Sequence, residues 1–60
     1  MYNILIVDDE KDIVHALKIY LSSESQYRTF AAYTGKEALE VLAREEIHLV
    51  LMDIMMPVMD

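Results

Sequence analysis

Continuous apolar runs alternate along the chain with apolar residues at helical spacing. Residues 3–7 and 47–52 are runs rich in β-branched and aliphatic side chains, and each run stops at a carboxylate, Asp8 or Asp53. This pattern is typical of parallel strands that are buried on both faces. Residues 27–33 mix β-formers with a charge and small alanines, which indicates a less buried strand at a sheet edge. The pattern therefore predicts three strands.

Two amphipathic helices are predicted between these strands. The first covers about residues 11–22, and the serine-rich segment that follows favours a loop. The second begins after Thr34, because residues 34–37 match a capping box: Thr34 accepts from the Glu37 amide, and Glu37 reaches back to the Thr34 amide. It runs to about Glu45. The side chains expected in the core are Ile13, Val14, Ala16, Leu17, Tyr20 and Leu21 from the first helix, Phe30 from the edge strand, and Ala38, Leu39, Val41, Leu42 and Ala43 from the second helix.

The order strand–helix–strand–helix–strand favours an α/β fold with a doubly wound parallel sheet. If the third strand lies on the other side of the first strand from the second, the strand order is 2-1-3 and each face of the sheet carries one helix. The third strand then has an open hydrogen-bonding edge, which is a template for further strands or for another chain. We therefore expect residues 1–60 to form the first βαβαβ half of a flavodoxin-like sheet.

Three carboxylates are expected to meet at one edge of this sheet. Parallel strands place their carboxyl ends at the same edge, and with strands one and three as neighbours this brings Asp8, Asp9 and Asp53 together where the chain reverses direction. Three charges at this spacing repel one another and require a cation. Oxygen ligands without cysteine favour a hard ion, and Mg²⁺ fits better than Ca²⁺ because the chain lacks a twelve-residue acidic loop containing glycine.

Composition excludes several other classes of protein. Five basic and eleven acidic residues give a net charge of −6, so direct contact of this segment with nucleic acid or an anionic membrane is unfavourable. No apolar run approaches the roughly 20 residues that span a bilayer. The absence of cysteine, and an N-terminus without the basic flank of a signal peptide, predict a cytoplasmic protein. The four methionines among residues 52–59 are expected to pack rather than to bind a soft metal.

Residues 6–10 (IVDDE) and 51–60 (LMDIMMPVMD) resemble the two signature stretches of bacterial response regulator receiver domains. Residues 34–39 (TGKEAL) also resemble the start of the second helix in that family, so three segments agree in order and spacing. The chain departs from the family at Val58, where many relatives have glycine, and at His48, where many have an acidic residue. We expect neither departure to touch the chemistry.

The resemblance implies a role for each matching residue. Asp53 would be the phosphorylated aspartate, Asp9 a direct Mg²⁺ ligand, Asp8 a ligand acting largely through water, and Met55 a ligand through its backbone carbonyl. The phosphoryl donor would be a sensor histidine kinase, and the family's hydroxyl and lysine residues would lie beyond Asp60. The module would be a phosphoacceptor, not a turnover enzyme, and control of transcription through a DNA-binding effector domain outside these residues would follow family habit.

Two other functions remain open. The fold could serve as a protein-interaction module that is not phosphorylated, with the open edge of the third strand or the first helix as its surface and a second copy of the chain among its partners. A phosphohydrolase or nucleotide enzyme ranks last, because there is no glycine-rich phosphate loop and no acid at the second position after Asp53. His15 is expected to be a solvated surface residue, not a phosphodonor.

Overall fold

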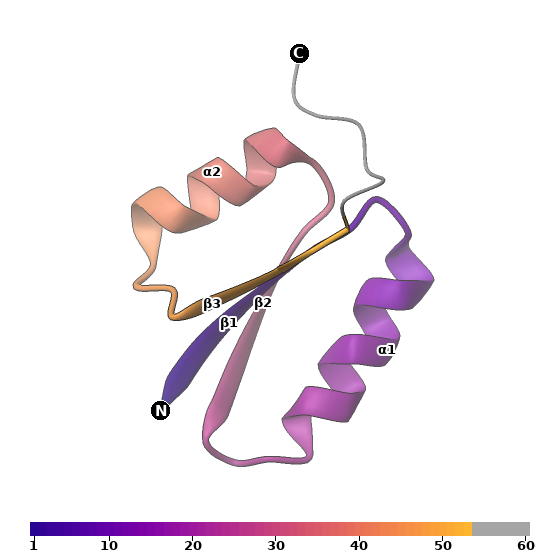
Figure 1. Ribbon diagram of the computed structural model, residues 1–60, viewed down its shortest axis with the longest axis vertical. Coiled ribbons are helices and arrows are strands. Elements are labelled where there is room, and N and C mark those ends of the chain that lie inside the picture. The colour runs from indigo at the N-terminus through magenta and orange to yellow at the C-terminus, as the bar shows by residue number, and fades with distance from the viewer. Residues whose placement is uncertain (54–60) are drawn as a thin grey trace.

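The computed structural model describes residues 1–53 as a three-layer α/β fold with the sheet in the middle (Figure 1). The elements along the chain are β1 (Tyr2–Val7), α1 (Lys11–Ser22), β2 (Tyr27–Ala32), α2 (Gly35–Arg44) and β3 (Leu49–Met52). The predicted order of elements and the predicted bounds of α1 are confirmed. The third strand is shorter than predicted: it begins at Leu49 and not at residue 47.

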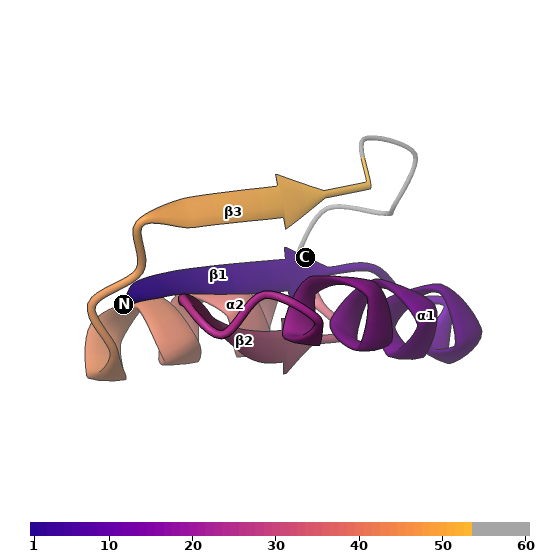
Figure 2. The same ribbon diagram turned by 90° about the horizontal axis from the view of Figure 1, so that it is seen from below.

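The sheet is parallel, and its strand order is β2-β1-β3, as the sequence predicted. Strand β1 lies in the centre, with Ile4 paired to Thr29 of β2 and to Leu49 of β3. All three strands therefore point the same way, and their carboxyl ends meet at one edge of the sheet (Figure 2). The doubly wound fold class is confirmed for this part of the chain.

The two helices lie on opposite faces of the sheet, and both pack on β1 and β2 (Figure 1). Among the described elements, neither helix packs on β3. Figure 2 shows β3 standing beyond the level of both helices, beside β1 alone. Part of each helix and the outer edge of β3 thus remain uncovered within residues 1–53.

The core is built around β1. Four consecutive residues of this strand, Ile4 to Val7, are at most 3 % exposed. Leu5 and Val7 pack with Ala32, Ala38 and Val41 into one cluster, on which Phe30 lies partly buried. Burying a Leu or Val side chain stabilises a fold by about 1.5–3 kcal/mol, so this central strand contributes much of the stability of the chain.

The capping of α2 follows the predicted box with one difference. The Glu37 N–H donates to Oγ1 of Thr34 over 3.1 Å, as expected. The Glu37 carboxylate, however, accepts from the Tyr33 N–H over 2.8 Å and not from the Thr34 amide. The reach-back prediction was wrong by one residue, because the extended backbone at Thr34 presents the preceding N–H to the helix start. Both hydrogen bonds still satisfy amides near the end of the helix.

Several side chains predicted to be in the core are exposed. Tyr20 is 75 % exposed, and Leu39 is 53 % exposed. These predictions were wrong because the helical pattern identifies an apolar face, whereas only the part of that face lying over β1 and β2 is covered within residues 1–53. The other predicted core residues that are exposed are Ile13, Ala16, Leu42 and Ala43.

Candidate metal centre

The carboxyl ends of β1 and β3 hold the three carboxylates in place. The Asp8 N–H donates to the carbonyl of Ala32 over 3.1 Å, which ties the end of β1 to β2. The Asp53 N–H donates to the carbonyl of Val7 over 3.1 Å, which ties the end of β3 to β1. The backbone of the sheet therefore fixes where these two side chains begin.

Asp8 is nearly buried, at 7 % exposed, and it shapes the start of α1. Its Oδ1 accepts from the Glu10 N–H over 2.9 Å, a contact of the Asx-turn kind between residues two apart. The residue that caps α1 is Glu10, whose side chain makes no capping hydrogen bond within the described residues. Neither Asp8 nor Asp9 is therefore the N-cap of α1.

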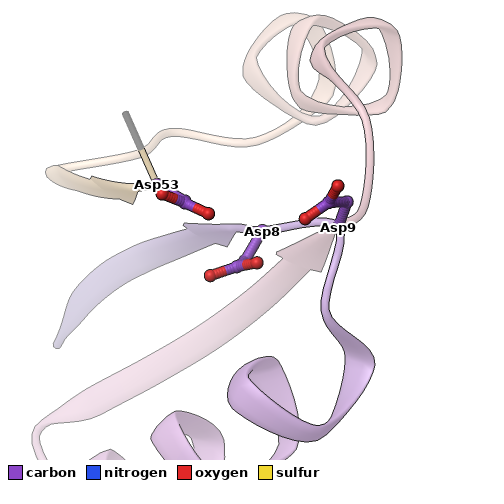
Figure 3. Close-up of side chains that lie close together, drawn as sticks. All are labelled: Asp8, Asp9 and Asp53. Carbon is purple, nitrogen blue, oxygen red and sulfur yellow. The ribbon is translucent and has the colours of Figure 1, made fainter. Parts of the chain in front are cut away.

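Asp8, Asp9 and Asp53 offer carboxylate oxygens that all lie within 4.8 Å of one another. Figure 3 shows the three side chains gathered where β1 and β3 end. Asp9 is exposed and Asp53 is intermediate, so the cluster runs from a buried carboxylate to one in contact with solvent. The sequence prediction that these residues meet is confirmed.

This donor set fits a hard divalent cation. It consists of carboxylate oxygens, and no cysteine is present in the chain to favour a softer metal. Mg²⁺ takes oxygen ligands and keeps several waters, which suits a cluster that is open on the Asp9 side. The cluster of Asp8, Asp9 and Asp53 is therefore compatible with Mg²⁺. Met55, whose carbonyl was predicted as a further ligand, lies outside the described residues.

An apolar cavity of about 300 Å³ adjoins the acidic cluster. Asp8 and Asp53 line its polar end, and Ile6, Ile13, Leu17 and Leu51 line the part between α1 and β3.

Sequence reasoning assigned no role to His48 or Asn3. In the structure the Asn3 N–H donates to Nδ1 of His48 over 2.9 Å, which joins the start of β3 to the start of β1. No motif in the sequence signals this contact, because the two residues are 45 positions apart. His15 is exposed on α1, as expected of a solvated surface residue.

Comparison with known proteins matches residues 4–60 to the family described as the response regulator receiver domain. The chain is 50 % identical over 54 residues to the regulatory protein VanR of Enterococcus faecium, covering 90 % of this chain and 23 % of that protein. It is 44 % identical over 57 residues to the response regulator GtcR of Aneurinibacillus migulanus, covering 95 % of this chain and 23 % of GtcR. The chain thus spans about a quarter of the length of these curated relatives.

A solved structure with the same fold comes from the complex of the P1 domain of CheA3 with CheY6 from R. sphaeroides. One chain of that complex superposes with a TM-score of 0.86 at 36 % sequence identity, covering 98 % of this chain and 47 % of that chain. Within residues 1–53, no helix is long and apolar enough to cross a membrane. Because the family match covers nearly the whole sequence and includes all three aspartates, the chain belongs to the response regulator receiver domain family.

Proposed function

We propose that this chain carries the phosphoacceptor of a two-component phosphorelay, with Asp53 as the residue that is phosphorylated. The observation that carries this proposal is the meeting of Asp8, Asp9 and Asp53 within 4.8 Å at the ends of two neighbouring strands. The phosphoryl donor is a phosphohistidine of a sensor histidine kinase. The complex of CheA3 P1 with CheY6, whose structure contains a chain of this fold, supports a partner of that class.

The transfer requires a nucleophile and a neutralised phosphoryl group. A carboxylate oxygen of Asp53 attacks phosphorus in line with the leaving nitrogen, a P–O bond forms as the P–N bond breaks, and the imidazole nitrogen that leaves takes up a proton. Asp8, Asp9 and Asp53, together with the Met55 carbonyl, would hold the Mg²⁺. When bound, Mg²⁺ supplies positive charge that offsets the charge on the phosphoryl oxygens.

The product is an acyl phosphate on Asp53 that later hydrolyses, so the chain takes part in one transfer and is not a turnover enzyme. The complete domain at most catalyses the hydrolysis of its own acyl phosphate. In the protein that carries this sequence, we propose a cytoplasmic location and control of transcription through an effector domain. The name of VanR, a regulatory protein, supports that output, and the net charge of −6 indicates that residues 1–60 do not contact DNA themselves.

Substitution of the acceptor tests the proposal. In the protein as its gene encodes it, Asp53→Asn keeps the size of the side chain and removes the nucleophile. We expect the Asp53→Asn variant to incorporate no hydroxylamine-labile phosphate, whether the donor is a histidine kinase or a small acyl phosphate. Asp12→Asn, which removes the same charge from an exposed position of α1, is the matched control and keeps wild-type incorporation. Unchanged incorporation in Asp53→Asn would disprove the proposed acceptor.

A second candidate function is a protein-interaction module that keeps the fold without phosphorylation. The exposed strand β3 favours it, since Leu49 and Met52 are 51 % and 53 % exposed and one edge of this strand is unpaired within residues 1–53. A second copy of the chain is one partner that such an edge can pair with. A calorimetric Mg²⁺ titration of the folded protein separates the two functions, because absence of binding supports the interaction module.

A further inference from the structure

The amino end of β3 is joined to β1 by side chains as well as by the backbone. The His48 N–H donates to the Asn3 carbonyl over 2.8 Å, and the Asn3 N–H donates to Nδ1 of His48 over 2.9 Å. The side-chain amide Nδ2 of Asn3 also donates to the carbonyl of Glu46 over 2.7 Å. We refer to Asn3, Glu46 and His48, with these three hydrogen bonds, as the Asn3–His48 clamp.

The clamp lies at the start of the β1–β3 ladder, next to its first paired residues, Ile4 and Leu49. In a regular parallel ladder, the N–H and the carbonyl of one residue bond to backbone groups two residues apart on the neighbouring strand. Continued from Ile4 and Leu49, the register pairs Asn3 with His48, so these partners would be the Ile47 carbonyl and the Leu49 N–H. Instead the Asn3 carbonyl accepts from the His48 N–H, and the Asn3 N–H donates to Nδ1 of His48. The clamp is therefore offset by one residue from the regular ladder, and the Asn3 side chain bridges the offset by donating to the Glu46 carbonyl.

The surroundings of His48 hold the ring in this orientation. Its ring meets the ring of Tyr2 edge-on, with the ring centroids 5.9 Å apart. Because Nδ1 accepts a hydrogen bond, the ring proton is on Nε2, and that nitrogen lies 4.0 Å from Oε2 of Glu46. His48 is therefore oriented by a backbone amide and by an aromatic ring.

The register of β3 depends heavily on such contacts. The strand has four residues, it pairs with β1, and neither helix packs on it. A slip of one residue would move Asp53 by about 3.3 Å along the strand and turn every side chain of β3 to the other face. Metal ligation does not tolerate a displacement of this size, because Mg²⁺ requires oxygens at about 2.0–2.1 Å in octahedral geometry.

We infer that His48 is a positioning residue for the phosphoacceptor: through Nδ1 and Asn3 it sets the register of β3 on β1 and so keeps Asp53 beside Asp8 and Asp9. This inference rests on the proposed function of Asp53. It assigns a role in the site to a residue at the opposite end of the strand from the carboxylates.

The test compares three variants in the protein as its gene encodes it. His48→Ala removes the acceptor, His48→Asn restores it because the amide Oδ1 has about the same place as Nδ1, and His15→Ala is a matched control at an exposed histidine of α1. Two properties are measured: the exchange rate of the Asp53 amide, which donates to the Val7 carbonyl, and the dissociation constant for Mg²⁺ alone. For His48→Ala we expect exchange and the Mg²⁺ dissociation constant each to rise roughly three- to tenfold, as loss of one hydrogen bond predicts. His48→Asn and His15→Ala are expected to match the wild type.

Each other result overturns a part of the inference. Wild-type exchange and Mg²⁺ affinity in His48→Ala would show that the clamp does not set the register. Equal damage in His48→Asn and His48→Ala would show that packing of the imidazole on Tyr2, and not the Nδ1 acceptor, is what matters. If the wild type itself neither binds Mg²⁺ nor is phosphorylated, the proposed function fails and His48 has no acceptor to position, whatever the exchange rates show.

Discussion

Strands β1 and β3 have nearly the same sequence pattern and opposite surroundings. Both are apolar runs that stop at an aspartate, yet four of the six β1 residues are buried and three of the four β3 residues are exposed. The difference arises from position, because β1 has a strand on each side and a helix on each face, whereas within residues 1–53 β3 has one neighbouring strand and neither helix packs on it. An apolar run thus indicates a strand suited to burial, while its neighbours decide how much of that burial is realised.

We expect the largest effect on stability from a Leu→Ala substitution, made separately in each of the two strands. Leu5→Ala removes a side chain with 0 % exposure, and Leu49→Ala removes one that is 51 % exposed. For the chain of residues 1–60 we expect Leu5→Ala to lower the free energy of unfolding by about 2–5 kcal/mol, and Leu49→Ala by less than about 1 kcal/mol. Urea titration monitored by circular dichroism measures both. Equal losses would mean that β3 is covered, and the contrast between the strands would then be abandoned.

The contrast between the strands was only partly available from the sequence. The runs that end at Asp8 and Asp53 predicted parallel strands. The meeting of the carboxylates followed from the predicted 2-1-3 order, because neighbouring parallel strands end at the same edge of the sheet. The exposure of Tyr20 and Leu39 was not predictable in the same way. Periodicity identifies an apolar face, but the extent of the surface that covers it depends on tertiary neighbours that have no local signal.

A smaller effect is expected from the cap of α2, the helix that covers β1 and not β3. Thr34→Ala removes the acceptor for the Glu37 N–H, and we expect a loss of about 1 kcal/mol in the free energy of unfolding. Thr34→Ser keeps a hydroxyl oxygen at this position and is the matched control, with nearly wild-type stability. The same urea titration measures both variants, and a loss in Thr34→Ser as large as that in Thr34→Ala would contradict the capping role.

The smallest effect concerns the charges at the ends of the two strands. Without a divalent cation the three carboxylates repel one another, so Asp9→Asn should stabilise the chain by up to about 1 kcal/mol, the size of the interaction between two charges 4 Å apart in water. Asp12→Asn, in the first turn of α1, should instead cost a few tenths of a kcal/mol, because it removes a favourable charge at a helix N-terminus.

Addition of Mg²⁺ should reverse the order of these two variants, since the wild type and Asp12→Asn gain stability from binding and Asp9→Asn gains less. Thermal unfolding with and without millimolar Mg²⁺ measures the change. If Asp9→Asn and Asp12→Asn respond equally to Mg²⁺, Asp9 is not a ligand.

The distance in sequence between β1 and β3 also bears on how the protein is made. Asn3 and His48 are 45 residues apart, and β1 cannot pair with β3 until both helices and β2 have been synthesised. At about 5–20 residues per second, the ribosome delivers β3 several seconds after β1. During that time the central strand has one partner and its other edge is open. The acidic cluster therefore comes into existence only after this last pairing step, so a nascent or misfolded receiver with an unpaired β3 lacks a complete acceptor site.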